Sequence, residues 1–407
     1  MAVATPENHG FSAARLARID ALVKTRYLDS GKLPHAQLLI ARDGEIVHFS
    51  HQGPAREGGK TVDETTLFRI ASMTKPVTSL AFMMLVEEAK VALDTPVHHL
   101  LPEFKGLGVY AGGGGGVPFA TRPTAEPMRM IDLLRHTSGL TYSFQNRTNV
   151  DAAYREGRIE NWHGNLTLDE FVAALGRLPL EFSPGAEWNY SVSTDVLGAV
   201  VERVSGMPLD RFFETRIFAP LGMHDTFFQV PADKLDRLAD CWTLGPDKRP
   251  VMYDRGAESA WAKFPRLVSG GGGLVSTALD YHRFNTMLLN KGALENTRLV
   301  SPKTIALMTM NHLPGGSDLA AMSRALFSET TNAGVGFGLG FAVTTDVAQT
   351  LIPGSVGEFY WGGMFSTAFF VDPVERISMV FMTQFSPSTL YPIRRELTTM
   401  IYSALEA

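Results

Sequence analysis

A short segment, residues 65–86, constrains the fold of this chain more than any other. Residues 65–71 are apolar and β-prone, and residues 76–86 are almost entirely apolar, as expected of a buried helix. Pro76 is tolerated in a helix only within the first turn, so the helix must begin just before it. Ser72 therefore lies close to a helix N-terminus, where unpaired N–H groups and the helix dipole favour negative charge.

Lys75 follows Ser72 by three positions, and residues at this spacing lie on the same face of a helix. A serine hydroxyl is a weak nucleophile until a neighbouring base takes its proton, and a lysine amine is one such base. The pair alone is weak evidence, because a capping serine followed by a lysine that lies along the helix surface has the same spacing.

Two stretches further along the chain carry groups that would complete such a site. Tyr190 follows a turn at 183–185 and precedes a predicted helix at 194–204, so it is either a packing aromatic or a phenol facing a pocket. A phenol normally titrates near 10 and serves as a base only beside a cation. Gly362 and Gly363 precede a predicted strand, where paired glycines indicate close approach of a ligand or another backbone. A free N–H there could donate to an oxyanion.

The overall composition is that of an ordinary globular protein. With 407 residues, 45% hydrophobic and 19% charged, the chain can form two lobes. A net charge of −5 without Lys/Arg runs argues against a nucleic-acid partner. Cys241 is the single cysteine, so no intrachain disulfide can form. Residues 1–10 lack the features of a secretion signal and no apolar run is long enough for a membrane span, so we expect a cytoplasmic protein of undetermined oligomeric state.

The two ends of the chain together predict one sheet. We expect a helix over 11–30, a final helix over 392–405, and strands over 37–42, 46–50, 336–343, 367–371 and 377–382. The region between these two ends, from about 75 to 330, is predicted to consist mainly of helices joined by Pro/Gly loops, including 131–135, 168–175, 194–204 and 278–289. The glycines at 112–116 are predicted to form a mobile loop tip. The prediction is an α+β fold. A discontinuous α/β lobe (1–74 and 331–407) carries an antiparallel sheet from both termini, a helical lobe (75–330) is inserted, and the site lies in the crevice between them.

Three other classes of protein find no support in the motifs. The α/β-hydrolase motif Gly-x-Ser-x-Gly is absent, because its nearest approach, residues 353–357, begins with proline. Residues 58–61 resemble the end of a phosphate-binding loop, but Pro54 stands where the first glycine belongs and no helix pattern follows. His98 and His99 are adjacent, so their side chains diverge, and no His-Glu-x-x-His occurs. We expect neither a metal nor a cofactor.

Four motifs occur in the order of the serine β-lactamase/penicillin-binding-protein fold: Ser72-Met73-Thr74-Lys75, residues 133–140, Trp188-Asn189-Tyr190-Ser191 and Trp361-Gly362-Gly363. Residues 220–223 and 269–277 are similar to that fold as well. Within it, the chain resembles the family VIII carboxylesterases, the esterase branch of the class C β-lactamase-like enzymes. This resemblance implies the β-lactamase/transpeptidase-like form of the α+β fold.

The resemblance also implies a role for each residue of the site. Ser72 would be the nucleophile of a serine esterase that works through an acyl-enzyme. Lys75 and Tyr190 would act as a coupled pair, and either of them could take the serine proton. The backbone N–H groups of Ser72 and Met364 would form the oxyanion hole.

Departures from the family pattern predict the substrate. The usual Lys-Thr-Gly, whose cation holds a substrate carboxylate, is replaced by Trp361-Gly362-Gly363, and residues 351–375 contain no Lys or Arg. Val192 stands where class C β-lactamases carry an asparagine. Loss of a charge-assisted hydrogen bond costs roughly 1.5–3 kcal/mol. We therefore expect Trp361, Gly362, Gly363 and Val192 to form the substrate site. The expected substrates are small, neutral, short-chain esters, and β-lactam hydrolysis should be weak.

Three alternative functions stay open at this stage. Acyl transfer to an alcohol is the close one, and β-lactamase or D-Ala-D-Ala peptidase activity uses the same residues. A non-catalytic binding protein of the same fold is a more distant alternative, because fold does not fix function. Loss of the serine, the lysine or the tyrosine would mark such a protein, and all three are present.

Overall fold

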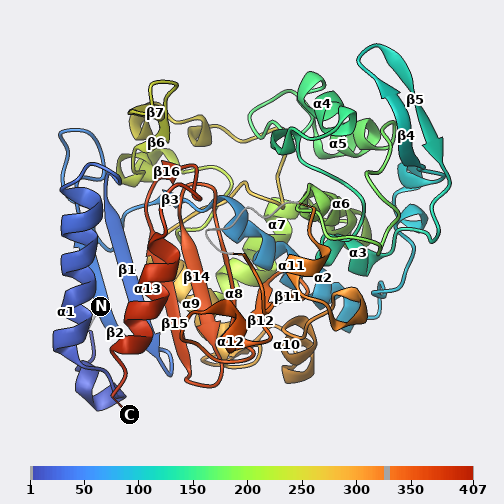
Figure 1. Cartoon of the computed structure of the whole chain (residues 1–407). Coiled ribbons are helices and arrows are strands. Elements are labelled where there is room, and N and C mark those ends of the chain that lie inside the picture. Colours follow the sequence, from blue (N-terminus) through green and yellow to red (C-terminus); the bar gives the residue numbers. More distant parts are fainter. Residues whose placement is uncertain (1–2, 325–330, 407) are drawn as a thin grey trace.

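A seven-stranded antiparallel sheet built from both ends of the chain forms the frame of the molecule (Figure 1). The computed structural model describes residues 3–324 and 331–406, so residues 1–2, the predicted end of the inserted lobe at 325–330, and residue 407 lie outside the described part. In spatial order the strands are β11 (Val335–Phe337), β12 (Ala342–Thr344), β13 (Phe359–Gly362), β14 (Ala368–Asp372), β15 (Ile377–Met382), β1 (Ala36–Arg42) and β2 (Glu45–Gln52).

The strands at the centre of the sheet are buried on both faces, which explains their nearly continuous apolar sequences. Along β1, Leu38 and Ile40 face one hydrophobic cluster, whereas Leu39 and Ala41 face another. The first cluster lies under α1 (Ala13–Leu22) and α13 (Ile393–Ser403), which pack side by side. The second lies under α9 (Ala278–Leu289). The sheet is therefore covered by helices on both faces.

Most of the predicted elements are present, and the fold class predicted from the sequence is confirmed. The expected first helix is split, because α1 continues as a π-helical segment, η2 (Val23–Leu28). The expected strand over 336–343 is wrong: two short strands, β11 and β12, pair with each other across a reversal. Gly340 takes a left-handed φ of 105° in that reversal, and a Cβ on Gly338 would lie 2.2 Å from the Met308 carbonyl oxygen. Glycine thus permits the chain to turn back.

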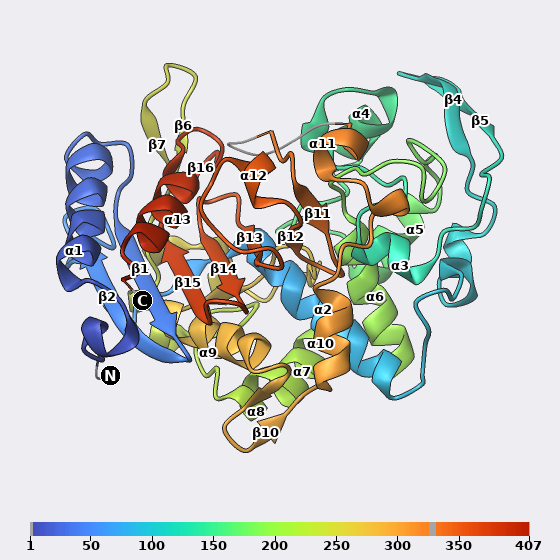
Figure 2. The ribbon, with the colours of Figure 1, turned by 60° about the horizontal axis from the view of Figure 1, so that its bottom comes forward.

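The region between the two halves of the sheet is mainly helical. Figure 2 shows α2 (Thr74–Glu87) beside α6 (Ser193–Ser205), and these two helices pack together. The other helices are α3 (Met130–Leu134), α4 (Asn149–Glu156), α5 (Leu168–Leu175), α7 (Leu209–Phe213), α8 (Ala219–Leu221), α10 (Pro302–Met308), α11 (Leu319–Met322) and α12 (Val347–Thr350). Because α9 lies inside the predicted insert yet packs on the sheet, the division into lobes at 74 and 331 stays a prediction.

Small sheets complete the architecture around the frame. They are β3 (Phe68–Arg69) with β8 (Val275–Ser276), β4 (Val109–Gly114) with β5 (Val117–Arg122), β6 (Cys241–Leu244) with β7 (Pro250–Asp254) and β16 (Phe385–Ser386), and β9 (Ala293–Leu294) with β10 (Thr297–Arg298). The glycine tract at 112–116 is thus not only a loop tip, because its first three residues belong to β4. Among residues 3–324 and 331–406, no helix has the length and apolar character needed to span a bilayer.

Candidate active site

Ser72 lies in a 3-10 turn, η3 (Ala71–Met73), that connects β3 to the N-terminus of α2. The backbone before it is anchored, because the Ile70 N–H donates to the Leu274 carbonyl oxygen (3.0 Å). Ala71 takes a left-handed φ of 45°, which strains a residue that carries a Cβ. Strain of this kind is held in place by well-packed surroundings and is concentrated at functional sites. The turn thus fixes Ser72 at the position predicted from Pro76.

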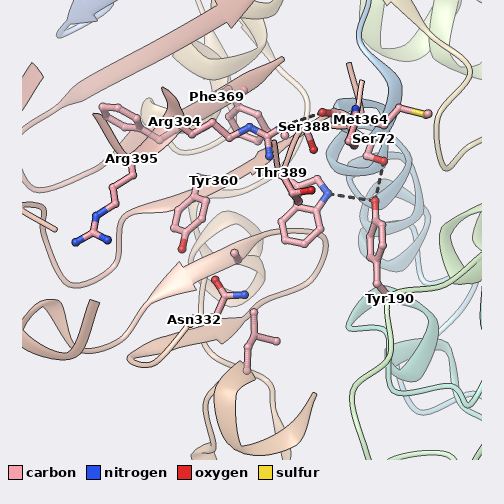
Figure 3. A pocket seen from close by; sticks show the side chains of 18 of the residues that line it. Ser72, Tyr190, Asn332, Tyr360, Met364, Phe369, Ser388, Thr389, Arg394 and Arg395 are labelled. Carbon is pink, nitrogen blue, oxygen red and sulfur yellow. Dashed lines mark hydrogen bonds between the residues drawn. The ribbon is translucent and has the colours of Figure 1, made fainter. Parts of the chain in front are cut away.

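Two side chains reach the hydroxyl of Ser72. The Lys75 Nζ donates to Ser72 Oγ (3.2 Å), and the Tyr190 hydroxyl donates to the same atom (2.7 Å). Figure 3 shows the second of these hydrogen bonds. Lys75 is 2% exposed, and its Nζ lies 4.6 Å from the centroid of the Tyr190 ring. The structure therefore brings together the three residues that the sequence predicted as catalytic.

A buried carboxylate that the sequence did not reveal supports the lysine. Lys75 Nζ donates its second hydrogen bond to the Gly271 carbonyl oxygen (2.7 Å), while the Gly271 N–H donates to Asp195 Oδ1 (3.0 Å). A Cβ on Gly271 would lie 2.3 Å from Asp195 Oδ2, so the close approach requires glycine. Burial raises the pKa of the Asp195 carboxyl, and the charge of Lys75 opposes this shift. Asp195 thus holds in place the residue Gly271, whose carbonyl oxygen orients the ammonium.

Aromatic rings form a wall around Tyr190. His136 packs against the phenol, with ring centroids 5.0 Å apart, and Trp188 stacks at 6.2 Å. Burial, reinforced by the charge of Lys75, lowers the pKa of His136 well below its ordinary value. His136 is therefore a neutral ring that packs against Tyr190 and does not add a second cation to the site.

The loop after β13 brings a backbone N–H next to the serine turn. The Gly363 N–H donates to the Thr367 carbonyl oxygen (2.9 Å), and the Thr367 hydroxyl donates to the Ile70 carbonyl oxygen (3.3 Å). A Cβ on Gly363 would lie 2.5 Å from that same Ile70 oxygen, so only glycine allows this contact. Within the described residues, neither the Ser72 nor the Met364 N–H donates to another backbone group. Both N–H groups are left over for a ligand, as an oxyanion hole requires.

A cation that sequence reasoning missed lies beside this loop. Arg394 of α13 donates from Nη2 to the Gly363 carbonyl oxygen (2.6 Å) and to the Thr367 carbonyl oxygen (3.0 Å). A Cβ on Gly362 would lie 2.6 Å from the carbon of the guanidinium. The absence of Lys and Arg from residues 351–375 therefore does not mean that no cation lies near the Trp-Gly-Gly motif. The arginine lies outside that stretch, on a helix that follows three further strands, β14, β15 and β16.

The site opens into a cavity of about 710 Å³. Trp361, Gly362, Gly363 and Met364 line it together with Ser72 and Tyr190, and aromatic side chains form much of the remaining wall: Tyr142, Phe144, Trp162, Trp188, Tyr253 and Tyr360. The Trp361 indole also contacts the catalytic group, because its Nε1 donates to the Tyr190 hydroxyl (3.4 Å).

Val192 does not reach the cavity. It precedes α6 and is 0% exposed, with its side chain in the hydrophobic core, and it is not among the residues of the cavity wall. The expectation that Val192 contacts the substrate is therefore wrong. An apolar side chain at this position gains more from burial in the core than from facing a half-open cavity.

Comparisons with known proteins agree with this geometry. The sequence profile of the Beta-lactamase family matches residues 19–398. Esterase EstB of Burkholderia gladioli is 35% identical over 393 residues, which cover 91% of each chain. The structure of EstCE1, described as a hydrolase with promiscuous acyltransferase activity, superposes with a TM-score of 0.79 at 28% identity and covers 96% of this chain and 99% of its own. Simvastatin synthase of Aspergillus terreus, at 23% identity and a TM-score of 0.79, covers 97% and 98% and shares the fold.

Proposed function

This chain belongs to the β-lactamase family, and on that premise we propose that it is a serine carboxylesterase of the family VIII type, which hydrolyses short-chain esters through an acyl-enzyme. One observation carries the proposal: Ser72 Oγ lies within hydrogen-bond distance of both Lys75 Nζ and the Tyr190 hydroxyl, at the wall of a largely aromatic cavity. The similarity to EstB and EstCE1 supports the same activity.

In the proposed reaction, Ser72 Oγ attacks the ester carbonyl carbon while the Lys75–Tyr190 pair takes its proton. The ammonium of Lys75 favours the negative charge that Tyr190 would carry after accepting that proton. The N–H groups of Ser72 and Met364 stabilise the oxyanion, the bond to the alcohol oxygen breaks, and the pair returns the proton to the alcohol. Water then releases the acid from Ser72 by the same steps.

Small, neutral esters are the proposed substrates, with Trp361, Gly362 and Gly363 as the wall against the acyl or alcohol group. The aromatic lining of the cavity supports this choice. The two arguments drawn from the sequence do not, because Val192 is buried away from the cavity and the cation of Arg394 lies near the motif. Acyl transfer to an alcohol is a second candidate, favoured by the acyltransferase activity described for EstCE1. Action without a metal or cofactor and a cytoplasmic location stay predictions of the sequence.

The proposal is tested with Ser72→Ala and p-nitrophenyl butyrate. We expect kcat to fall at least about 1,000-fold, and the parent protein to gain the mass of one butyryl group on Ser72 when the reaction is quenched early. Ser388→Ala, which removes another hydroxyl that lines the same cavity, is the matched control and should keep its activity. Full turnover by Ser72→Ala would disprove the assignment. Added alcohol, with analysis of the ester products, separates hydrolysis from acyl transfer.

A further inference from the structure

Arg394 donates a hydrogen bond to one end of the peptide group whose other end is the proposed oxyanion donor. Its Nη2 lies 2.6 Å from the Gly363 carbonyl oxygen, and that carbonyl shares a planar, resonance-coupled amide with the Met364 N–H. A charged donor on an amide oxygen withdraws electron density from the nitrogen and makes its N–H a stronger donor, as hydrogen bonds in a chain polarise one another. We propose that Arg394 is a positioning residue that polarises the Gly363–Met364 peptide and so strengthens the oxyanion hole.

The surroundings of this contact are built to keep it in place. The Ser366 N–H also donates to the Gly363 carbonyl oxygen (3.1 Å), so both lone pairs of that oxygen are engaged. The second hydrogen bond of Arg394, to the Thr367 carbonyl oxygen, fixes the guanidinium across the turn. Gly362 has no Cβ at the place where the guanidinium packs. Arg394, although it belongs to α13, is therefore bound to the turn by specific hydrogen bonds.

The same turn is linked to the serine. The Thr367 hydroxyl donates to the Ile70 carbonyl oxygen, and the Met73 N–H donates to that same oxygen (3.1 Å) from within the turn that carries Ser72. Arg394 thus fixes one of the two oxyanion donors relative to the other. Arg394 also lines the cavity, but the role we propose for it acts through its hydrogen bonds to the two carbonyl oxygens and is indirect.

The chemistry of the proposed reaction decides when this effect acts. Negative charge develops on the ester oxygen only as Ser72 attacks, so a more polarised Met364 N–H stabilises the transition state more than the bound ester. Removing the guanidinium should therefore lower kcat and leave KM nearly unchanged. This inference rests on the proposed esterase function and adds to it the group that supports the oxyanion hole.

Arg394→Met tests the inference, with Arg395→Met as the matched control. Arg395 lies one residue further along α13 and donates to the Leu351 carbonyl oxygen (3.5 Å), so its loss removes the same charge but keeps the hydrogen bonds of Arg394 to Gly363 and Thr367. With p-nitrophenyl butyrate we expect Arg394→Met to lower kcat about 10-fold or more, with KM within a factor of two. Its affinity for a butyl boronic acid, which mimics the tetrahedral oxyanion, should fall by a similar factor. Added guanidinium ion should restore part of kcat in Arg394→Met and have no effect on Arg395→Met.

Several results would overturn the inference. Equal losses in both variants would indicate a general effect of charge. A rise in KM that is confined to carboxylate-bearing esters would make Arg394 a direct substrate contact. If Arg394→Met does not fold, Arg394→Lys is measured in its place, because it keeps a cation. Unchanged boronate affinity together with reduced kcat in Arg394→Lys would contradict the proposed role. Acylation of Ser72 in the parent is measured first, so that failure of the esterase proposal is distinguished from failure of this one.

Discussion

At the scale of single residues, the site depends on one serine oxygen shared by two groups. Lys75 reaches Ser72 from the next turn of the chain, and Tyr190 reaches it from a loop 118 residues later. The two groups also lie close to each other, because Lys75 Nζ is 4.6 Å from the centroid of the Tyr190 ring. The pair must therefore work as a unit.

We expect Tyr190→Phe and Lys75→Met each to lower the rate of Ser72 acylation about 100- to 10,000-fold. The double variant should be little slower than either single one, because removing one member already disables the proton transfer. Single-turnover acylation by p-nitrophenyl butyrate measures all three rates. Losses that simply multiply would show that the two residues act independently.

Trp361 contacts the Tyr190 hydroxyl, yet its indole cannot take up a proton and so cannot be the base. We expect Trp361→Ala to raise KM and to shift the preferred acyl chain towards longer esters, while Ser72 is still acylated. Trp361→Phe keeps the ring, loses the N–H and should preserve the chain-length preference. A panel of p-nitrophenyl esters from acetate to octanoate gives the comparison. Complete loss of acylation in Trp361→Ala would place the indole in the catalytic machinery.

Sequence patterns could identify Ser72, Lys75 and Tyr190 because each stands in a short motif. They could not identify Asp195 or Arg394, since each acts across a contact between elements that are distant in the chain. A carboxylate on a predicted helix, or an arginine near the C-terminus, usually lies on the surface. Only the folded backbone shows which of them is turned inwards.

At the scale of elements, α13 is attached to the sheet by a buried acid pair. The Tyr402 hydroxyl donates to Asp372 Oδ2 (2.6 Å) and is also hydrogen-bonded to the carboxyl of Glu358. Burial raises the pKa of Glu358 to about 8, and the charge of Asp372 adds to this, although the hydrogen bond with Tyr402 opposes it. A phenol has one proton to donate, so a protonated Glu358 can supply the second hydrogen bond of the group.

This pair makes stability depend on pH in a defined direction. Glu358 has a pKa of about 8 in the folded protein and an ordinary value of 4.5 when unfolded, so its proton is held more tightly by the folded state. Its contribution is fully present below pH 4.5 and is lost as pH rises towards 8, at up to about 1.4 kcal/mol per pH unit. Relative to Glu358→Gln, the parent should lose free energy of unfolding between pH 5 and pH 8. Urea denaturation at both pH values measures the difference.

The control for this prediction is Glu45→Gln, which removes an exposed carboxylate from β2. We expect it to show the same pH dependence as the parent. Equal pH dependence in the parent and in Glu358→Gln would mean that Glu358 is ionised in the folded protein.

The elements themselves were predictable where one physical signal dominated. Strands β14 and β15 and helix α9 lie where apolar runs and turn residues predicted them. The signal failed at 336–343, because alternation with period two describes a single strand as well as two strands joined through glycines. The packing of α9 on the sheet could not be predicted either, since an apolar helix face does not specify its partner.

At the scale of the whole molecule, one hydrophobic cluster joins the sheet to the helices. It includes Phe369 and Val380 of the sheet, Leu80 of α2, Val200 of α6 and Phe284 of α9. Such a continuous core favours unfolding as one unit, even though the chain reads as two lobes.

We therefore expect calorimetry to show a single thermal transition in which the calorimetric and van't Hoff enthalpies agree. Scans at two heating rates control for irreversible unfolding, which makes the midpoint depend on the scan rate. Two separate transitions would contradict the prediction and would support lobes 1–74 with 331–407 and 75–330 as independent units.

The hydrogen bond from Thr367 to Ile70 joins residues that are 297 positions apart, which has a consequence for the protein as it is made. A ribosome adds about 5–20 residues each second, so roughly 15–60 s pass between the synthesis of the serine turn and that of the loop that faces it. During this time the nucleophile exists without its oxyanion hole, and the sheet lacks its last strands. A nascent chain that ends before Met364 therefore lacks one donor of the proposed oxyanion hole, and we expect no ester hydrolysis from it.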